Sequence, residues 1–358
     1  MKNNLLSLLT CAAVLAFSSC SKSSKDDVQT TDATLETKVI TDFTSVVANP
    51  DYTDLQAKAS LLNTAVTTLV ATPTDANLLA AQTAWKNTRA PWEACEGFLF
   101  GPVEDFNYDP TMDSWPVDKN ELDAILASNN ALGVTDVNAL QDTQKGFHAI
   151  EYIIFGLGGT QKAANITARE KIYLTSLTQS LYNTATQLQN SWSASGGNYT
   201  KQVTTAGSGS TVFASRKDLF IALVGSMADI CNEVSTSKMQ TPLVAQDSLQ
   251  DESAFSHNSI ADFKNNITGI YNAYMCTYNG ATGTGLNQLV AAKNAALDLK
   301  LRTQMQAAIA SFSTITTTYE KAIYTNQSQV KAVQAAINTL HDSLDGDLTT
   351  FVNTNIKD

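Results

Sequence analysis

Apolar residues recur every three or four positions along nearly the whole chain after residue 31, and this spacing constrains the fold more than any other feature of the sequence. Alternating runs of Val, Ile and Tyr bounded by tight turns, which would indicate strands, are nearly absent. We therefore predict an all-α protein. The expected helices cover residues 32–47, 52–71, 74–100, 119–128, 135–156, 167–193, 211–236, 259–278, 284–315 and 317–354.

A stretch rich in Ser and Gly, residues 193–210, is the clearest break in composition and divides the chain into two halves. Each half has enough helix for a four-helix bundle. We expect an N-terminal bundle over 32–195 and a C-terminal bundle over 210–358, packed side by side. A second irregular region, 101–118, is rich in proline, and long loops inside helical proteins are often functional.

The first residues of the chain predict export and lipid anchoring. A basic Lys2 precedes an apolar run over 5–17 that is too short to span a bilayer as a mature helix, which indicates a cleaved signal segment. Small residues then lead into Cys20, the pattern for cleavage before that Cys and for diacylation, and two acyl chains give stable anchoring. We expect a lipoprotein signal peptide over 1–19 and a polar, flexible tether over 20–31. The alternative is an ordinary secretory signal that leaves Cys20 as a thiol.

Composition excludes several other classes of protein. The net charge of −11 argues against binding to nucleic acid or to anionic lipid surfaces. No Asp follows Cys20, so the retention signal of many inner-membrane lipoproteins is missing and the outer membrane is favoured; the face of that membrane stays open. We expect no later stretch to be apolar enough to cross a membrane. Cys95, Cys231 and Cys276 allow at most one disulfide and lack zinc-finger spacing.

The segment 146–156 places His148 and Glu151 three residues apart, and so on one face of a helix whose other positions are apolar. A buried carboxylate is costly unless it is paired, hydrogen-bonded or bound to a metal. Either these two side chains bond one another and a neighbouring helix without any ligand, or they belong to a binding site.

A second segment, 85–102, combines charge with aromatic residues. One helical face would hold Trp85, Arg89, Glu93, Glu96 and Phe100. Arg89 and the two glutamates could form a surface ion-pair row, although the surrounding aromatic residues favour burial. Cys95 is expected to be a small core residue.

A third segment, 251–262, has many polar side chains before a helix. Ser259 and Asp262 have the spacing of a capping box, in which the hydroxyl and the acidic side chain satisfy backbone N–H groups at the start of the helix.

Taken together, these segments resemble the imelysin family. The resemblance rests on Arg89-Ala90-Pro91-Trp92-Glu93 with Phe100-Gly101-Pro102, on Asp113-Ser114-Trp115-Pro116, and on Gly146-x-His148-x-x-Glu151. Glu252-Ser253, followed by Ser256 and Ser259, is also similar. Gly-x-His-x-x-Glu is the signature of the family, and the order and spacing match over most of the chain that follows the signal segment.

The resemblance implies two helical bundles with the signature at a cleft near their junction. It also implies a link to bacterial iron uptake, because related domains occur in periplasmic iron-transport lipoproteins. Members are classed as metallopeptidases after an insulin-cleaving membrane protein, but many have no demonstrated peptidase activity.

Our first hypothesis is a binding protein for iron, or for an iron-bearing ligand, that works with membrane components of an iron-uptake system. Carboxylates with one imidazole suit iron, and zinc is the other candidate metal. The predicted metal ligands are His148, Glu151 and Glu93. The other predicted ligand-binding residues are Arg89, Trp92, Glu96, Asp113, Glu252, Ser253 and Ser256.

Two further hypotheses stay open. A zinc peptidase would ordinarily use His-Glu-x-x-His, which the sequence lacks, so its hydrolytic residues are not visible. A metal-free module that binds a peptide or a protein partner predicts instead that Arg89 satisfies the acidic side chains internally.

Overall fold

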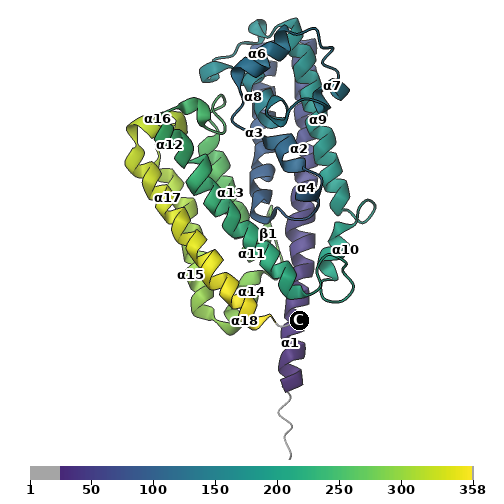
Figure 1. Ribbon diagram of the computed structural model, residues 1–358, viewed down its shortest axis with the longest axis vertical. Helices are drawn as coiled ribbons and strands as arrows, with labels where there is room; N and C mark the ends of the chain where they lie inside the picture. The colour runs from purple at the N-terminus through teal and green to yellow at the C-terminus, as the bar shows by residue number, and fades with distance from the viewer. Residues whose placement is uncertain (1–24, 357–358) are drawn as a thin grey trace, which may run out of the picture.

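The computed structural model describes residues 25–356, with side chains from residue 33 onward, and it is almost entirely helical (Figure 1). Within this part of the chain the strands are limited to one two-residue antiparallel hairpin, β1 (Thr277–Tyr278) and β2 (Ala281–Thr282). The prediction of an all-α protein is therefore confirmed. The predicted signal peptide and Cys20 lie outside the described residues.

The first half of the chain is built around four helices that close into a bundle. Helix α2 packs against α3 and α9, and α8 completes the ring by packing against both α3 and α9. The helices of this half are α1 (Lys25–Asp42), α2 (Asn49–Ala71), α3 (Asp75–Cys95), α4 (Pro102–Asp105), α5 (Tyr108–Asp113), α6 (Lys119–Ala127), α7 (Val134–Asn138), α8 (Gly146–Phe155), α9 (Ala168–Trp192) and α10 (Tyr199–Thr204). Short 3-10 turns lie at Glu96–Phe98, Asp142–Gln144, Leu157–Gly159 and Ala163–Asn165.

The second half repeats this architecture. Helix α11 packs against α13 and α17, and α15 closes the ring between α13 and α17. Its helices are α11 (Arg216–Glu233), α12 (Gln240–Ala245), α13 (Ser259–Met275), α14 (Leu286–Lys293), α15 (Ala295–Ser311), α16 (Tyr319–Thr325), α17 (Gln327–Asp342) and α18 (Thr349–Asn355), with 3-10 turns at Ser248–Gln250 and Phe312–Thr314. Figure 1 shows the two bundles side by side, with α1 and α18 at the same end of the molecule.

The two bundles meet where α3 and its 3-10 extension cross α13 and α11. A side chain at Gly269 on α13 would place its Cβ 2.0 Å from the carbonyl oxygen of Ala94, and one at Gly97 would lie 2.8 Å from the amide nitrogen of Ile270. Two glycines thus allow the backbones to touch at the crossing. Such close contact fixes the position of one bundle on the other.

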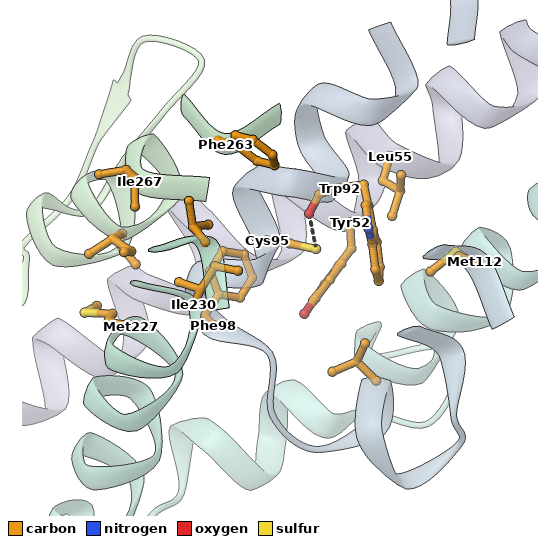
Figure 2. Close-up of a cluster of buried hydrophobic side chains, with 14 of the residues drawn as sticks. Tyr52, Leu55, Trp92, Cys95, Phe98, Met112, Met227, Ile230, Phe263 and Ile267 are labelled. Atoms are coloured by element: carbon orange, nitrogen blue, oxygen red, sulfur yellow. Dashed lines mark hydrogen bonds between the residues drawn. The ribbon is translucent and has the colours of Figure 1, made fainter. Parts of the chain in front are cut away.

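Apolar side chains fill the space around this crossing, and Figure 2 shows a part of this cluster. Cys95 and Phe98 lie in one apolar cluster with Ile230 of α11 and Ile267 of α13, and all four are almost fully buried. The buried apolar residues of both bundles form one continuous cluster. Cys95, Cys231 and Cys276 are all buried free thiols, as expected of a core cysteine such as Cys95.

Several predicted helix boundaries are wrong. Helix α1 begins at Lys25 rather than 32, so residues 25–31 of the predicted tether are helical, and a π-helical segment (Phe43–Ala48) joins α1 to α2. Extending an existing helix costs far less than nucleating one, which lets a polar segment continue it. The long predicted helices over 284–315 and 317–354 break at Asn294 and Asn326.

The predicted helix over 135–156 is also wrong, because α7 and α8 are separate helices. Gly146 has a φ of +75°, and a Cβ there would lie 2.2 Å from the carbonyl oxygen of Met112. Only glycine tolerates both conditions, and the resulting turn brings the start of α8 against the end of α5. The irregular region 101–118 contains the short helices α4 and α5.

Helix α11 continues through a π-helical segment (Val234–Lys238) into α12. By length and composition this helix, Arg216–Ala245, could cross a membrane, which contradicts the expectation that no later stretch is apolar enough. More than half of its apolar window is buried inside the fold, against α13, α17 and α18. Its apolar composition is therefore accounted for by its position in the core.

Replacing Gly269 by Ala should destabilise the protein, because the new methyl group would force α13 away from Ala94. We expect Gly269→Ala to lower the free energy of unfolding by about 1–3 kcal/mol in urea denaturation. Gly225→Ala is the matched control, since nothing lies within 4 Å of a Cβ at that helical glycine. The control should be neutral or slightly stabilising. Equal stability of the two variants would contradict close contact at the crossing.

Candidate functional site

Arg89 lies fully buried at the junction of the bundles, in contact with carboxylates from four segments. Its guanidinium pairs with Glu93, one turn further along α3, and with Asp113 at the end of α5. It also lies 2.8 Å from Glu252, in the loop before α13, and 3.6 Å from Asp262 on α13. A surface ion-pair row is therefore excluded, and burial is confirmed.

We call the surrounding group the charged cluster. It consists of Arg89, Glu93, Glu96, Asp113, His148, Glu151, Lys238, Glu252 and Asp262, all buried. Six carboxylates in this group face only three basic side chains.

Asp113 connects the two predicted motifs. Its carboxylate accepts a hydrogen bond of 2.6 Å from the indole N–H of Trp92, and it contacts Arg89 and His148. Burial alone would raise the pKa of Asp113, but the positive charge of Arg89 and the hydrogen bond with His148 hold that pKa well below its ordinary value. Asp113 is therefore ionised.

His148 lies between two carboxylates. Its Nε2 is 3.0 Å from Asp113 Oδ1, and its Nδ1 is 2.9 Å from Glu151 Oε2, the contact that their spacing in the sequence allows. Burial alone would lower the pKa of His148, but the hydrogen bonds with both acidic residues raise it to about 9. In the absence of a metal the imidazole is therefore protonated at neutral pH.

Glu151 connects the two bundles through backbone hydrogen bonds. Its Oε1 accepts N–H bonds from Phe255 at 3.1 Å and from Ser256 at 2.7 Å, while Oε2 contacts His148. Both oxygens are thus satisfied, and the loop before α13 is held against α8.

Lys238 is a member of the charged cluster that sequence reasoning missed. It ends the π-helical segment after α11, and its fully buried ammonium lies 3.0 Å from Glu96 and 3.0 Å from Glu252, with Glu93 at 3.5 Å. Asn266 on α13 donates hydrogen bonds to Glu93 of α3 and to Glu96 of the 3-10 turn that follows it. The surrounding sequence, Ser235-Thr236-Ser237, is polar, so nothing local distinguishes Lys238 from a surface lysine.

The predicted capping box at Ser259 and Asp262 is wrong. Ser259 donates its hydroxyl hydrogen to Asp251 at 2.7 Å and accepts the backbone N–H of Ser253 at 3.1 Å. Asp262 accepts hydrogen bonds from Ser253 Oγ at 2.6 Å and from Asn258 at 2.7 Å. These side chains fasten the loop 251–258 over the charged cluster instead of capping the helix.

Burial keeps part of the charged cluster difficult to ionise. Burial, the largest cause, raises the pKa of Glu252 to about 7 and that of Asp262 to about 6, although Arg89 and Lys238 partly oppose the shift at Glu252. A buried carboxylate with a raised pKa is stabilised in its charged form by any additional cation.

Among the described residues, one group has the geometry to bind a metal ion. One ligand atom each from Asp113, His148 and Glu252 lie within 4.8 Å of one another. Glu252 Oε2 is buried without a hydrogen-bond partner among the described residues, and the neighbour of His148 Nε2, 3.0 Å away, is Asp113, itself one of the three. Imidazole and carboxylate are ordinary ligands of iron and zinc, so these residues fit such an ion once His148 has lost its proton.

The predicted metal ligands are arranged differently from this group. Only His148 belongs to it, because Glu151 is bonded on both oxygens and Glu93 is paired with Arg89 and approached by Lys238. Asp113 and Glu252, which the sequence assigned to general ligand binding, take their place. Of the other predicted residues, Arg89 and Glu96 are members of the charged cluster and Trp92 donates to Asp113. Ser253 donates to Asp262, and Ser256 Oγ is buried without a hydrogen-bond partner among the described residues.

The fold and the site define a class: an all-α protein of two four-helix bundles with a buried carboxylate–imidazole cluster at their junction. The family model for imelysin matches residues 48–346, so the chain belongs to the imelysin family.

Individual relatives agree with this assignment. The chain is 29% identical over 343 residues to iron-regulated protein A of Synechococcus elongatus, covering 94% of this chain and 90% of that protein. Its fold matches a crystal structure assigned as an iron-regulated protein A precursor of Parabacteroides distasonis, with a TM-score of 0.81, 24% identity and coverage of 90% and 95% of the two chains. An imelysin-like protein of Psychrobacter arcticum gives a TM-score of 0.73 at 13% identity, with 91% and 98% covered.

The protonated form of His148 should make stability depend on pH. Its pKa of about 9 in the folded protein exceeds the ordinary value of 6.5. The contribution of protonated His148 to the free energy of unfolding is therefore fully present below about pH 6.5 and is lost as pH rises through about 9. Urea denaturation of chelator-treated protein across this range should show the decline, and His148→Asn should lose that component. His341→Ala, at a partly exposed histidine, is the control. A His148 resonance that titrates near 6.5 by NMR would contradict the geometry.

Proposed function

We propose that this imelysin-family protein binds a divalent metal ion, with iron the first candidate, through Asp113, His148 and Glu252 as part of iron handling in the cell envelope. The observation that supports this most is the convergence of these three ligand atoms inside a buried cluster with twice as many carboxylates as basic groups. A metal ion would offset that excess negative charge. It would either act as a Lewis acid or be the ligand that the protein transports.

The chemistry of the ligands favours iron or zinc over magnesium or calcium, because an imidazole nitrogen is a poor ligand for the latter two. The name of the Synechococcus relative, an iron-regulated protein, supports iron. Arg89 and Lys238 would orient the two carboxylates, since each contacts one or both of them directly.

A metal-free binding module is the second candidate, and one observation favours it. Arg89 already contacts Asp113 and Glu252, so the acidic side chains have internal partners. In that case the charged cluster would only hold the two bundles together, and the surface around it would bind a partner. A peptidase has less support, because Glu151, the carboxylate beside His148, has both oxygens hydrogen-bonded and is not placed to activate water.

The position in the cell is part of the proposal. The signal pattern before Cys20 supports an exported protein anchored by lipid, and the absence of Asp after Cys20 supports the outer membrane. A tethered binding protein there would pass its ligand to membrane components of iron uptake.

Lipid anchoring can be tested by metabolic labelling with a radioactive fatty acid. The wild-type protein should incorporate label and fractionate with membranes, whereas Cys20→Ser should lose both. Cys95→Ser is the control, because that thiol is buried in the core. Equal labelling of wild type and Cys20→Ser would contradict the anchor.

Metal binding can be tested on protein treated with chelator and titrated anaerobically with Fe(II), and in parallel with Zn(II), by calorimetry and elemental analysis. We expect one ion per chain for the wild type. Glu252→Gln and His148→Ala should each weaken binding by about tenfold or more, because each removes one ligand. His341→Ala should bind as wild type does. Circular dichroism must show that every variant is folded.

The outcome separates the two candidates. No metal uptake by folded wild-type protein would overturn the metal site and leave the metal-free module. Stoichiometric uptake that His148→Ala and Glu252→Gln do not weaken would place the metal elsewhere and contradict the proposed ligands.

A further inference from the structure

A separate cavity of about 440 Å³ lies on the face of the N-terminal bundle formed by α5, α7 and α9. We call it the polar pocket, and its lining includes Thr111, Asn138, Lys145, Tyr182, Asn183 and Gln187. Its volume falls within the range of about 300–1,000 Å³ that is usual for small-molecule sites. None of these residues belongs to the charged cluster.

The side chains that line the polar pocket have unused hydrogen-bond donors. The side-chain oxygen of Asn138 accepts from Ser180 at 2.6 Å, and that of Asn183 accepts from Gln179 at 2.8 Å. The phenol oxygen of Tyr182 accepts from Gln56 at 3.3 Å.

The oxygens of Asn138, Asn183 and Tyr182 are thus engaged within the fold, while their N–H and O–H groups donate to no described residue. The Gln187 and Thr111 side chains form no hydrogen bond with the described residues either. The pocket therefore offers several neutral donors to a ligand rich in oxygen acceptors.

Charge in the polar pocket is already balanced. The nearly buried ammonium of Lys145 lies 3.0 Å from Asp142 and donates to the carbonyl oxygens of Leu140, at 3.1 Å, and Asn138, at 3.4 Å. Three contacts use all three of its hydrogens. No carboxylate lines the pocket either. A charged ligand would lose its hydration on entering the pocket and would find no unpaired group of opposite charge there. The lining therefore favours a neutral ligand.

We infer that the polar pocket binds a neutral polyhydroxylated molecule of mono- to disaccharide size. Sugar hydroxyl and ring oxygens are acceptors for such amide and hydroxyl donors, and the half-buried Tyr182 in the lining adds an aromatic ring against which sugar C–H groups can pack.

The polar pocket and the charged cluster share two chain segments. Thr111 lies two residues before Asp113, and Lys145 lies three residues before His148. Between these positions the backbones touch, because Gly146 packs directly on the carbonyl of Met112. A molecule that contacts Thr111 and Lys145 therefore contacts the two segments that position Asp113 and His148.

The test uses chelator-treated full-length protein, so it does not depend on metal binding. Glucose, N-acetylglucosamine and maltose are titrated by calorimetry, with citrate as a charged comparison. We expect one-to-one binding of at least one sugar and none of citrate. The double variant Asn183→Ala/Gln187→Ala should bind that sugar about tenfold more weakly. Asn190→Ala, at an exposed position of the same helix, should bind as wild type does.

A second readout reports on the link to the charged cluster. The chain has three histidines, so selectively labelled histidine gives a simple NMR spectrum. Sugar binding should shift the His148 resonance and leave that of His341 unchanged. The inference is overturned if no sugar in the panel binds, if only citrate binds, or if the double variant binds as tightly as wild type. Failure here would leave the metal proposal untouched.

Discussion

The buried guanidinium of Arg89 is the interaction on which the junction of the two bundles depends. It contacts carboxylates from α3, α5, the loop 251–258 and α13, so four segments distant in sequence meet at one side chain. An unpaired buried charge costs several kcal/mol, and breaking a buried pair typically costs about 3–5 kcal/mol. Each segment is therefore held where it keeps Arg89 paired. Apolar packing and the Gly97–Gly269 contact bring the bundles together, whereas the charges specify one arrangement.

The same charges explain why the junction can also be a binding site. Arg89, Lys238 and protonated His148 do not balance six carboxylates, and burial, the largest cause, raises the pKa of Glu252 and Asp262. Protons and a metal ion are alternative ways to offset the remaining charge. Asp113 and His148 are positioned by the contact between Met112 and Gly146, while Glu252 comes from the other bundle. The proposed ligands therefore assemble only when the bundles are docked.

Prediction from the sequence succeeded where local spacing carries the information. His148 and Glu151 are one helical turn apart, and their contact follows from helix geometry alone. Arg89 and Glu93 are likewise neighbours on α3. Lys238 could not be identified, because its burial results from α11 packing against a glutamate-bearing helix in the other half. Ser259 and Asp262 have the spacing of a cap, but competing partners in the loop 251–258, directly before the helix, outweigh it.

The sequence by itself determined the all-α class, most helices of the two bundles and the segments that contain the charged cluster, because periodicity and i, i+3 or i, i+4 spacing are local properties. Only the tertiary structure decided which carboxylates surround His148. It brings one ligand atom each of Asp113, His148 and Glu252 within 4.8 Å of one another, since residues from three segments converge through packing that no local pattern encodes. It also decided where helices end, as at Gly146, where contact with Met112 requires glycine.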